Sequence, residues 1–237
     1  MSRSLFYGDC LFETVRVEGS PQRLERHVDR FVRSAAALKY PSEELERGVE
    51  ALHSLEGRAD GLWRVTFVRG ADVFGDWDPN VLFDHRPATL RPRPNLGVVE
   101  GYIPTDSLSE FKTTNYLRSM MARRAALAAG FDDALMVSHC GHLGEASMAN
   151  VFLVLNDRLV TPEICGILPG TTREAILENA RSAGIQIEER TVSRSELAMA
   201  SEVILTSAGV LAQSARSLEG RALSEHWGPI LAEFACA

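Results

Sequence analysis

A proline-rich stretch near the middle of the chain most constrains how it can fold. Residues 84–96, Asp-His-Arg-Pro-Ala-Thr-Leu-Arg-Pro-Arg-Pro-Asn-Leu, contain three prolines. Proline interrupts helices and cannot donate a hydrogen bond within a sheet, so such a stretch is typical of a linker. We therefore expect a small N-terminal domain over residues 1–84, a linker over 85–96 and a larger domain over 97–237.

The first part of the chain mixes helical and strand-like patterns. Apolar residues recur at helical spacing over residues 24–38, which Pro41 follows, and a second helix is expected over 42–55. Residues 5–17 and 63–68 alternate between apolar and polar side chains, as a half-buried strand does. These four elements predict a small α/β domain.

The second part is richer in strands than in helices. Two helices are expected over residues 117–129 and 172–183, each followed by a glycine. Strands are expected over residues 96–103, 134–138, 151–155, 158–162, 185–192 and 202–206. They follow one another as hairpins more often than they alternate with helices, so the expected fold class is α+β with two domains.

Composition excludes several classes of protein. The chain has 237 residues, of which 45% are hydrophobic, and no apolar run approaches the roughly 20 residues of a membrane span. A net charge of -7 without a dense basic run argues against a nucleic-acid partner. The first residues lack the apolar core of a signal peptide and no CxxC pair is present, so we expect a cytoplasmic protein with reduced cysteines. Its four cysteines are Cys10, Cys140, Cys165 and Cys236.

Lysine is scarce in this chain. Of 25 basic residues, only Lys39 and Lys112 are lysines. Arginine does not lose its proton, so it cannot form an imine, and the chain offers two candidates for a covalent amine. Lys39 follows a predicted helix and is interpreted as a solvated cation. Lys112 lies beside Phe111, where partial removal from water would make the amine a better nucleophile.

The common nucleotide and hydrolase motifs are absent, and two local clusters have competing interpretations. Residues 138–142, Ser-His-Cys-Gly-His, hold three possible metal ligands, but no second ligand pair exists, so we expect a hairpin turn and no metal site. Thr171 and Glu174 match a capping box at the start of a helix. The same helix start would also suit a phosphate group.

Five segments, in order, resemble motifs of the class IV aminotransferases, the fold-type IV pyridoxal-phosphate enzymes. The family includes branched-chain and D-amino-acid aminotransferases and aminodeoxychorismate lyase. The resembling segments are Phe6-Tyr7-Gly8-Asp9-Cys10-Leu11-Phe12-Glu13-Thr14, Arg26-His27-Val28-Asp29-Arg30-Phe31, Lys112-Thr113-Thr114-Asn115-Tyr116-Leu117, Glu145-Ala146-Ser147-Met148-Ala149-Asn150-Val151-Phe152 and Leu168-Pro169-Gly170-Thr171-Thr172-Arg173. Together they extend over most of the chain.

The resemblance implies a cofactor, pyridoxal 5'-phosphate, in the cleft between the two domains, and a role for each matching residue. Lys112 would hold the cofactor as an imine and then move the substrate's α-proton. Glu145 would face the pyridine nitrogen, and Tyr116 would bond the phenolic oxygen. The phosphate would be bound by Arg30, Thr171 and Thr172.

The chain also departs from the family pattern. Cys10 replaces a glycine, and the segment of residues 71–77 is acidic and aromatic where many relatives have a basic or Gly-Tyr-rich loop. Ala208 falls where relatives carry a phosphate-binding hydroxyl, for which Ser207 or Thr206 would substitute. The first motif begins at residue 6, without the two short strands that usually precede it.

Three functions remain open at this point. The Lys-x-x-Asn spacing of Lys112 and Asn115 favours aminodeoxychorismate lyase, which releases pyruvate to give 4-aminobenzoate for folate synthesis. An aminotransferase acting on a D- or branched-chain amino acid or an amine is the second, and a non-catalytic binding protein is the third. For the enzymes, the resemblance implies a small-molecule substrate and a homodimer.

Overall fold

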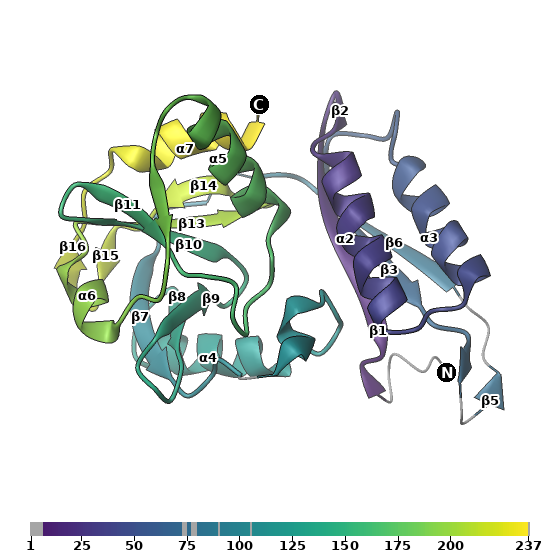
Figure 1. Ribbon diagram of the computed structural model, residues 1–237, viewed down its shortest axis with the longest axis horizontal. Coiled ribbons are helices and arrows are strands. Elements are labelled where there is room, and N and C mark those ends of the chain that lie inside the picture. The colour runs from purple at the N-terminus through teal and green to yellow at the C-terminus, as the bar shows by residue number, and fades with distance from the viewer. Residues whose placement is uncertain (1–6, 73–74, 77–79, 90, 105, 237) are drawn as a thin grey trace. The chain divides into compact units, whose positions relative to one another are not determined.

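The chain divides into two compact units in a computed structural model that describes residues 7–72, 75–76, 80–89, 91–104 and 106–236 (Figure 1). The first unit comprises Met1–Thr89 and Phe111–Tyr116. The second comprises Leu90–Glu110 and Leu117–Ala237. This division differs from a single cut at residues 85–96, because a short segment beyond the cut returns to the first unit.

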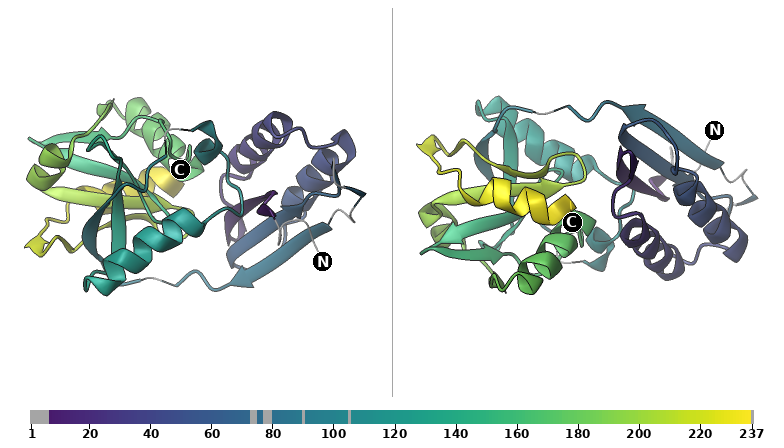
Figure 2. Two further views of the ribbon diagram at one scale, coloured as in Figure 1. Left: turned by 90° about the horizontal axis from the view of Figure 1, so that it is seen from below. Right: turned by 90° about the horizontal axis from the view of Figure 1, so that it is seen from above.

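The first unit is a four-stranded antiparallel sheet with two helices on one face (Figures 1 and 2). The strand order is β2-β1-β3-β6, and β1 pairs with β3 along almost its whole length. These elements are β1 (Cys10–Glu18), β2 (Ser20–Pro21), α2 (Leu24–Ala37), α3 (Ser42–His53), β3 (Gly61–Val68) and β6 (Asn80–Arg86). A separate two-stranded pair, β4 (Ala71–Asp72) and β5 (Gly75–Asp76), lies in the segment expected to differ from relatives, part of which falls outside the described residues.

The two faces of β1 have different roles. Leu11 and Val15 pack into the core formed with the helices, where Phe31 and Leu52 are also buried. Side chains alternate across a strand, so Glu13 lies on this helix-covered face and Phe12 on the other. The sheet therefore buries one carboxylate beneath α2.

The segment Phe111–Tyr116 is attached to β1 by backbone hydrogen bonds. Phe12 donates its N–H to the carbonyl of Lys112 over 2.9 Å, and Thr114 donates to the carbonyl of Cys10 over 2.9 Å. Leu11 forms an isolated bridge with Thr113, so Thr113 shares the helix-covered face. Lys112 accordingly shares the opposite face with Phe12.

The second unit contains two five-stranded sheets that enclose a common hydrophobic core. One has the order β12-β11-β10-β13-β14 and the other the order β16-β15-β7-β8-β9. The strands are β7 (Asn95–Glu100), β8 (Asp133–Val137), β9 (Leu143–Ala146), β10 (Asn150–Leu155), β11 (Arg158–Thr161), β12 (Ile187–Glu189), β13 (Glu202–Ser207), β14 (Leu211–Ser214), β15 (Ser217–Leu218) and β16 (Arg221–Ala222).

Helices cover the outer faces of this double sheet (Figure 1). Helices α5 (Thr171–Ser182) and α7 (Trp227–Cys236) pack on the outer face of β10 and β13, where Phe152 and Ile204 are fully buried. Helix α4 (Leu117–Ala128) packs against β7 and β8. The short η1 (Ser107–Glu110) and α6 (Arg194–Met199) complete the unit.

The α+β class and all four predicted helices are confirmed. Helices α2 and α4 begin where the sequence placed them, and α5 begins one residue earlier. Helices α6 and α7 and strand β6 were not predicted. Helix α7 is apolar on most sides and strand β6 is largely exposed, so the apolar residues of these two elements show no clear period. Within the described residues, no helix is long and apolar enough to cross a membrane.

Candidate active site

Lys112 lies within a group of aromatic side chains on the face of the first unit's sheet opposite α2 and α3. Its Nζ is 3.4 Å from the Oη of Tyr116 and 4.6 Å from the centre of the Phe12 ring. Phe12 and Tyr116 meet edge to face, with ring centres 5.4 Å apart. The amine is half-buried, and backbone bonds to β1 fix the segment that carries it.

Gly8 packs closely against the segment that carries Lys112. Gly8 has a φ of +65°, and a Cβ there would lie 2.0 Å from the Oδ1 of Asn115. The hydroxyl of Thr114 donates to the carbonyl of Gly8 over 2.9 Å. A side chain at position 8 would therefore displace Asn115, which explains why a glycine is needed there.

A second cation shares the ring of Phe12. The guanidinium of Arg64 lies 3.6 Å from the ring centre. Burial lowers the pKa of Arg64, and the nearby Tyr116 and Asp84 partly offset that effect. Two cationic side chains beside one ring form a place where an anionic group would be attracted.

Arg30, expected to bind a phosphate, pairs with a buried carboxylate. Its Nε donates to Oε1 of Glu13 over 2.9 Å and its Nη2 donates to Oε2 over 2.5 Å. The Nδ1 of His27 lies 2.7 Å from the same Oε2. All three side chains are nearly inaccessible to solvent.

The charges of this buried group are set by competing effects. Burial acts to raise the pKa of Glu13, but the Arg30 charge and the His27 hydrogen bond outweigh it and hold the pKa at about 2. Burial lowers the pKa of His27, and Glu13 offsets part of that change. A neutral His27 that donates to an ionised Glu13 agrees with both directions.

In the second unit, Glu145 of β9 connects the start of β10 with the loop that precedes α5. Its Oε2 accepts a hydrogen bond from the Asn150 side chain over 3.2 Å and one from the N–H of Leu168 over 3.4 Å. The same Asn150 amide donates to the carbonyl of Leu168 over 2.9 Å. Glu145 is half-buried, on β9, next to the loop that precedes α5.

The start of α5 differs from the expected capping box. Gly170 is the N-cap residue, so Thr171 is already helical and does not cap the helix with Glu174. A Cβ at Gly170 would lie 2.0 Å from the Oδ1 of Asn150, so the close approach of that amide requires glycine. Thr171 and Thr172 are both buried, and within the described part of the chain the Oγ1 of Thr172 has no hydrogen-bond partner.

The end of β13 places the candidate hydroxyls on different faces. The Oγ of half-buried Ser207 accepts a hydrogen bond from the N–H of Gly209 over 3.3 Å. Thr206 is 2% exposed, and no described residue forms a hydrogen bond with its Oγ1. Consecutive strand residues face opposite ways, so these two hydroxyls do not share a face.

The expected residues form two groups, each within its own unit. The first unit brings Lys112 beside Tyr116, with Arg30 on the other face of the sheet, and the second brings Glu145 beside the loop before α5. The groups fit pyridoxal phosphate: a half-buried lysine for covalent attachment, a carboxylate, and in the first turn of α5 the buried Thr172 hydroxyl, which has no hydrogen-bond partner among the described residues. The residue roles and the cleft between domains remain predictions.

Three residues that contribute contacts to these two groups were not identified as site residues from the sequence. Glu13 belongs to the first resembling segment and Arg64 lies between Trp63 and Val65 in a strand, but only the folded sheet places them beside Arg30 and Phe12. Asn150 belongs to a quoted motif, and that membership was the available signal. Its contact with Gly170 depends on a turn of the chain that no local pattern predicts.

Comparisons with known proteins identify relatives of this chain. The family model described as "Amino-transferase class IV" matches residues 10–218. The branched-chain-amino-acid aminotransferase of Pseudomonas aeruginosa is 25% identical, and the match covers 93% of this chain and 80% of that protein. The branched-chain-amino-acid aminotransferase-like protein 2 of Arabidopsis thaliana is 27% identical over 92% of this chain, but this chain spans only 42% of that relative's length.

Solved structures share the fold. A hypothetical aminotransferase from Mycobacterium tuberculosis, in its pyridoxal-phosphate-bound form, has a TM-score of 0.84 and 26% identity, covering 99% of this chain and 90% of its own. A candidate 4-amino-4-deoxychorismate lyase from Legionella pneumophila has a TM-score of 0.80 over 99% of this chain and 91% of its own. At 24% identity, that second likeness concerns the fold alone. The fold is thus that of the fold-type IV enzymes.

Proposed function

Because the chain belongs to the class IV aminotransferase family, whose enzymes use pyridoxal phosphate, we propose that it transfers the amino group of an amino acid. Lys112 is the proposed catalytic residue. Its amine would carry the cofactor and then take and return the proton on the substrate's α-carbon. When bound, the cofactor supplies an electron sink for the electrons left by that proton.

The position of Lys112 beside Tyr116 is the observation that carries this proposal. An Nζ–Oη distance of 3.4 Å lets the phenol orient the amine, and the two hydrophobic rings keep part of its surface from water. The carbonyl of Lys112 accepts a backbone hydrogen bond from β1, which fixes the main chain while the side chain remains available for catalysis. A tyrosine at position 116 resembles the branched-chain enzymes of the family. The relative from Pseudomonas aeruginosa described above is also a branched-chain-amino-acid aminotransferase.

The remaining residues would bind and orient the cofactor. Thr171, Thr172 and Ser207 are proposed phosphate ligands, and α5 adds the positive end of its dipole. Arg30 remains the candidate that the resemblance assigns to the phosphate, although its two hydrogen bonds to Glu13 hold it on the face of the sheet opposite Lys112. Glu145 would keep the pyridine nitrogen protonated, and its bonds to Asn150 and Leu168 fix the direction of its carboxylate. Arg64 would attract a carboxylate of the substrate toward Lys112.

A second candidate is 4-amino-4-deoxychorismate lyase, which releases pyruvate and leaves 4-aminobenzoate. The specific observation in its favour is the two-residue spacing between Lys112 and Asn115. Asn115 packs on Gly8, so the shorter segment is accommodated without distorting β1. Both candidates use the same lysine for proton movement and differ in which bond of the substrate breaks.

One paired assay separates the two candidates. Purified protein is supplied with aminodeoxychorismate, and pyruvate is measured; in parallel it is supplied with a branched-chain or D-amino acid and a keto acid, and the new amino acid is measured. Amino transfer without pyruvate release supports the first proposal. Pyruvate release without amino transfer would replace it with the lyase.

Two further expectations concern the protein as a whole. We propose that it acts as a homodimer on a small-molecule substrate, as the family resemblance implies, and sedimentation or light scattering measures that state. We also expect it in the cytoplasm, where its cysteines would stay reduced. Within the described residues these cysteines form no disulfide bond, as proteins of a reducing compartment usually do not.

A further inference from the structure

Two buried hydroxyls of the second unit have no hydrogen-bond partner among the residues that the structure describes. They are the Oγ1 atoms of Thr172, in the first turn of α5, and of Thr206, near the end of β13; each residue is 2% exposed. A buried hydroxyl without a partner costs free energy, so such groups are rare unless an ordered water, an ion or a ligand satisfies them. Their location relative to each other is therefore informative.

The cross-strand register places Thr206 on the face covered by α5. Thr206 pairs directly with Asn150 on β10, and paired residues in an antiparallel sheet share a face. Two residues earlier on the same face, Ile204 packs in the cluster that includes Ile176 of α5. Ile176 lies one helical turn after Thr172. The hydroxyls of Thr172 and Thr206 therefore both lie next to the contact between β13 and α5.

The side chain of Asn150 connects this pair to the beginning of α5. It donates to the carbonyl of Leu168 over 2.9 Å, and its Oδ1 occupies the space where a Cβ of Gly170 would be. The neighbour directly across the sheet from Asn150 is Thr206. The hydroxyl of Thr206 thus lies beside the N-terminal turn of α5, the positive end of that helix.

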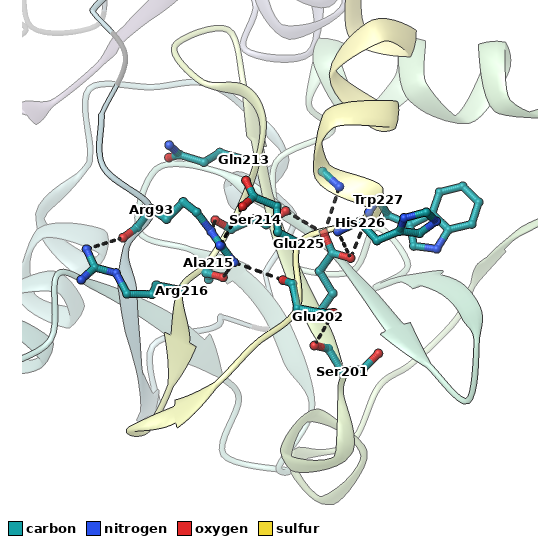
Figure 3. Close-up of polar contacts among 12 residues, drawn as sticks. Arg93, Ser201, Glu202, Gln213, Ser214, Ala215, Arg216, Glu225, His226 and Trp227 are labelled. Atoms are coloured by element: carbon teal, nitrogen blue, oxygen red, sulfur yellow. Dashed lines mark hydrogen bonds and ion pairs between the residues drawn. The ribbon is translucent and has the colours of Figure 1, made fainter.

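At the opposite end of β13, on the same face, a side chain of the strand already binds the N-terminus of helix α7 (Figure 3). Glu202 is fully buried and accepts hydrogen bonds from the N–H groups of His226, Trp227 and Gly228, over 3.1, 3.0 and 2.9 Å, and from the Ser214 hydroxyl over 2.6 Å. This carboxylate caps α7 with a negative charge from the protein itself. At the α5 end the strand offers a neutral donor instead, which suits a negative charge supplied by a ligand.

We propose that Thr206 donates its hydroxyl to the phosphate group of the cofactor, together with Thr172 and the first turn of α5. The inference rests on the proposed function, and it supplies the donor that Ala208 lacks. Ser207, on the other face and bonded to Gly209, would contribute less. Thr206 is thus a specific feature of this chain's phosphate site.

The test compares Thr206→Val with Thr206→Ser in protein freed of bound cofactor. Valine keeps the shape and removes the donor, whereas serine keeps the donor. Affinity is measured by absorbance titration with pyridoxal phosphate and, as a matched ligand without the anion, with pyridoxal. Thermal unfolding of each variant is recorded without ligand and with inorganic phosphate.

The expected result has two parts. Thr206→Val binds pyridoxal phosphate about ten-fold more weakly than the parent, binds pyridoxal equally well, and loses the phosphate-dependent rise in melting temperature. Without ligand it melts at the same or a higher temperature, because an unsatisfied buried hydroxyl is gone. Thr206→Ser retains most of the affinity.

Other outcomes overturn the inference. Equal affinity of parent and Thr206→Val for pyridoxal phosphate would show that Thr206 does not bind the anion. A ligand-free Thr206→Val protein that is less stable than the parent, with pyridoxal binding reduced as well, would assign Thr206 a purely structural role. A parent that takes up no pyridoxal phosphate at all would instead contradict the proposed function.

Discussion

Arg30 and Glu13 are joined by two hydrogen bonds, over 2.9 and 2.5 Å, in a part of the first unit that solvent hardly reaches. Breaking one side of a buried ion pair leaves the other charge uncompensated. Glu13→Gln should therefore lower the free energy of unfolding by about 3 kcal/mol or more, measured by urea denaturation.

Glu18→Gln is the matched control on the same strand. Glu18 pairs with Arg16 but is half exposed, so its loss should cost less than about 1 kcal/mol. If both variants lost the same small amount, the buried pair would be no more important than a surface one.

The same pair predicts how stability depends on pH. Glu13 has a pKa of about 2 in the folded protein against an ordinary value of 4.5, so acid protonates the unfolded chain first. The stabilisation is complete above about pH 4.5 and is lost as the pH falls toward 2, and the shift corresponds to about 3 kcal/mol. The lowered pKa of His27 acts in the same direction below its ordinary value of 6.5.

Urea denaturation at a series of pH values measures this dependence. The parent should lose stability steadily from about pH 6 to pH 3, and Glu13→Gln should lose less over the lower part of that range. Parallel curves for the two proteins would mean that Glu13 is not the titrating group.

Glu202 offers a prediction for the second unit. Its carboxylate accepts four hydrogen bonds, three of them from the start of α7 (Figure 3). Glu202→Gln replaces one acceptor oxygen by a donor that faces those N–H groups, so unfolding should become easier by about 2 kcal/mol. The control Glu225→Gln removes a half-exposed partner of Arg93 and should change stability by less than about 1 kcal/mol.

Arg64 should affect the substrate more than the chemistry. Arg64→Gln removes a cation that lies on the same ring as Lys112, so KM for a carboxylate substrate should rise about ten-fold while kcat changes less. Arg58→Gln removes the same charge from a guanidinium that lies over Trp63 and Phe83, and steady-state kinetics should be unchanged. An unchanged KM in the Arg64 variant would exclude it from substrate binding.

Much of the fold was predictable because periodic patterns are local. The apolar spacing of α2 and the alternation of β3 each follow from one contiguous segment. The return of Phe111–Tyr116 to the first unit was not predictable, because it depends on backbone bonds to β1, a hundred residues earlier. Sheet partners such as β7 and β15 are similarly distant in the sequence.

The candidate site divides in the same way. Lys112 was identified because the chain has two lysines and one of them falls in a motif. The capping box at Thr171 was wrong, since the helix begins one residue earlier than expected, with Gly170 as its cap. The burial of Thr206 and its pairing with Asn150 required the sheet register, which the sequence does not specify.

The covalent attachment of the cofactor at Lys112 tests the central claim most directly. Purified protein is incubated with pyridoxal phosphate, reduced with borohydride and mapped by peptide mass spectrometry. The account predicts the reduced cofactor on the peptide that contains Lys112, its loss in Lys112→Ala, and its retention in Lys39→Arg, since exposed Lys39 lies outside the group around Phe12. Labelling at Lys39 alone, or no labelling of the parent protein, would contradict it.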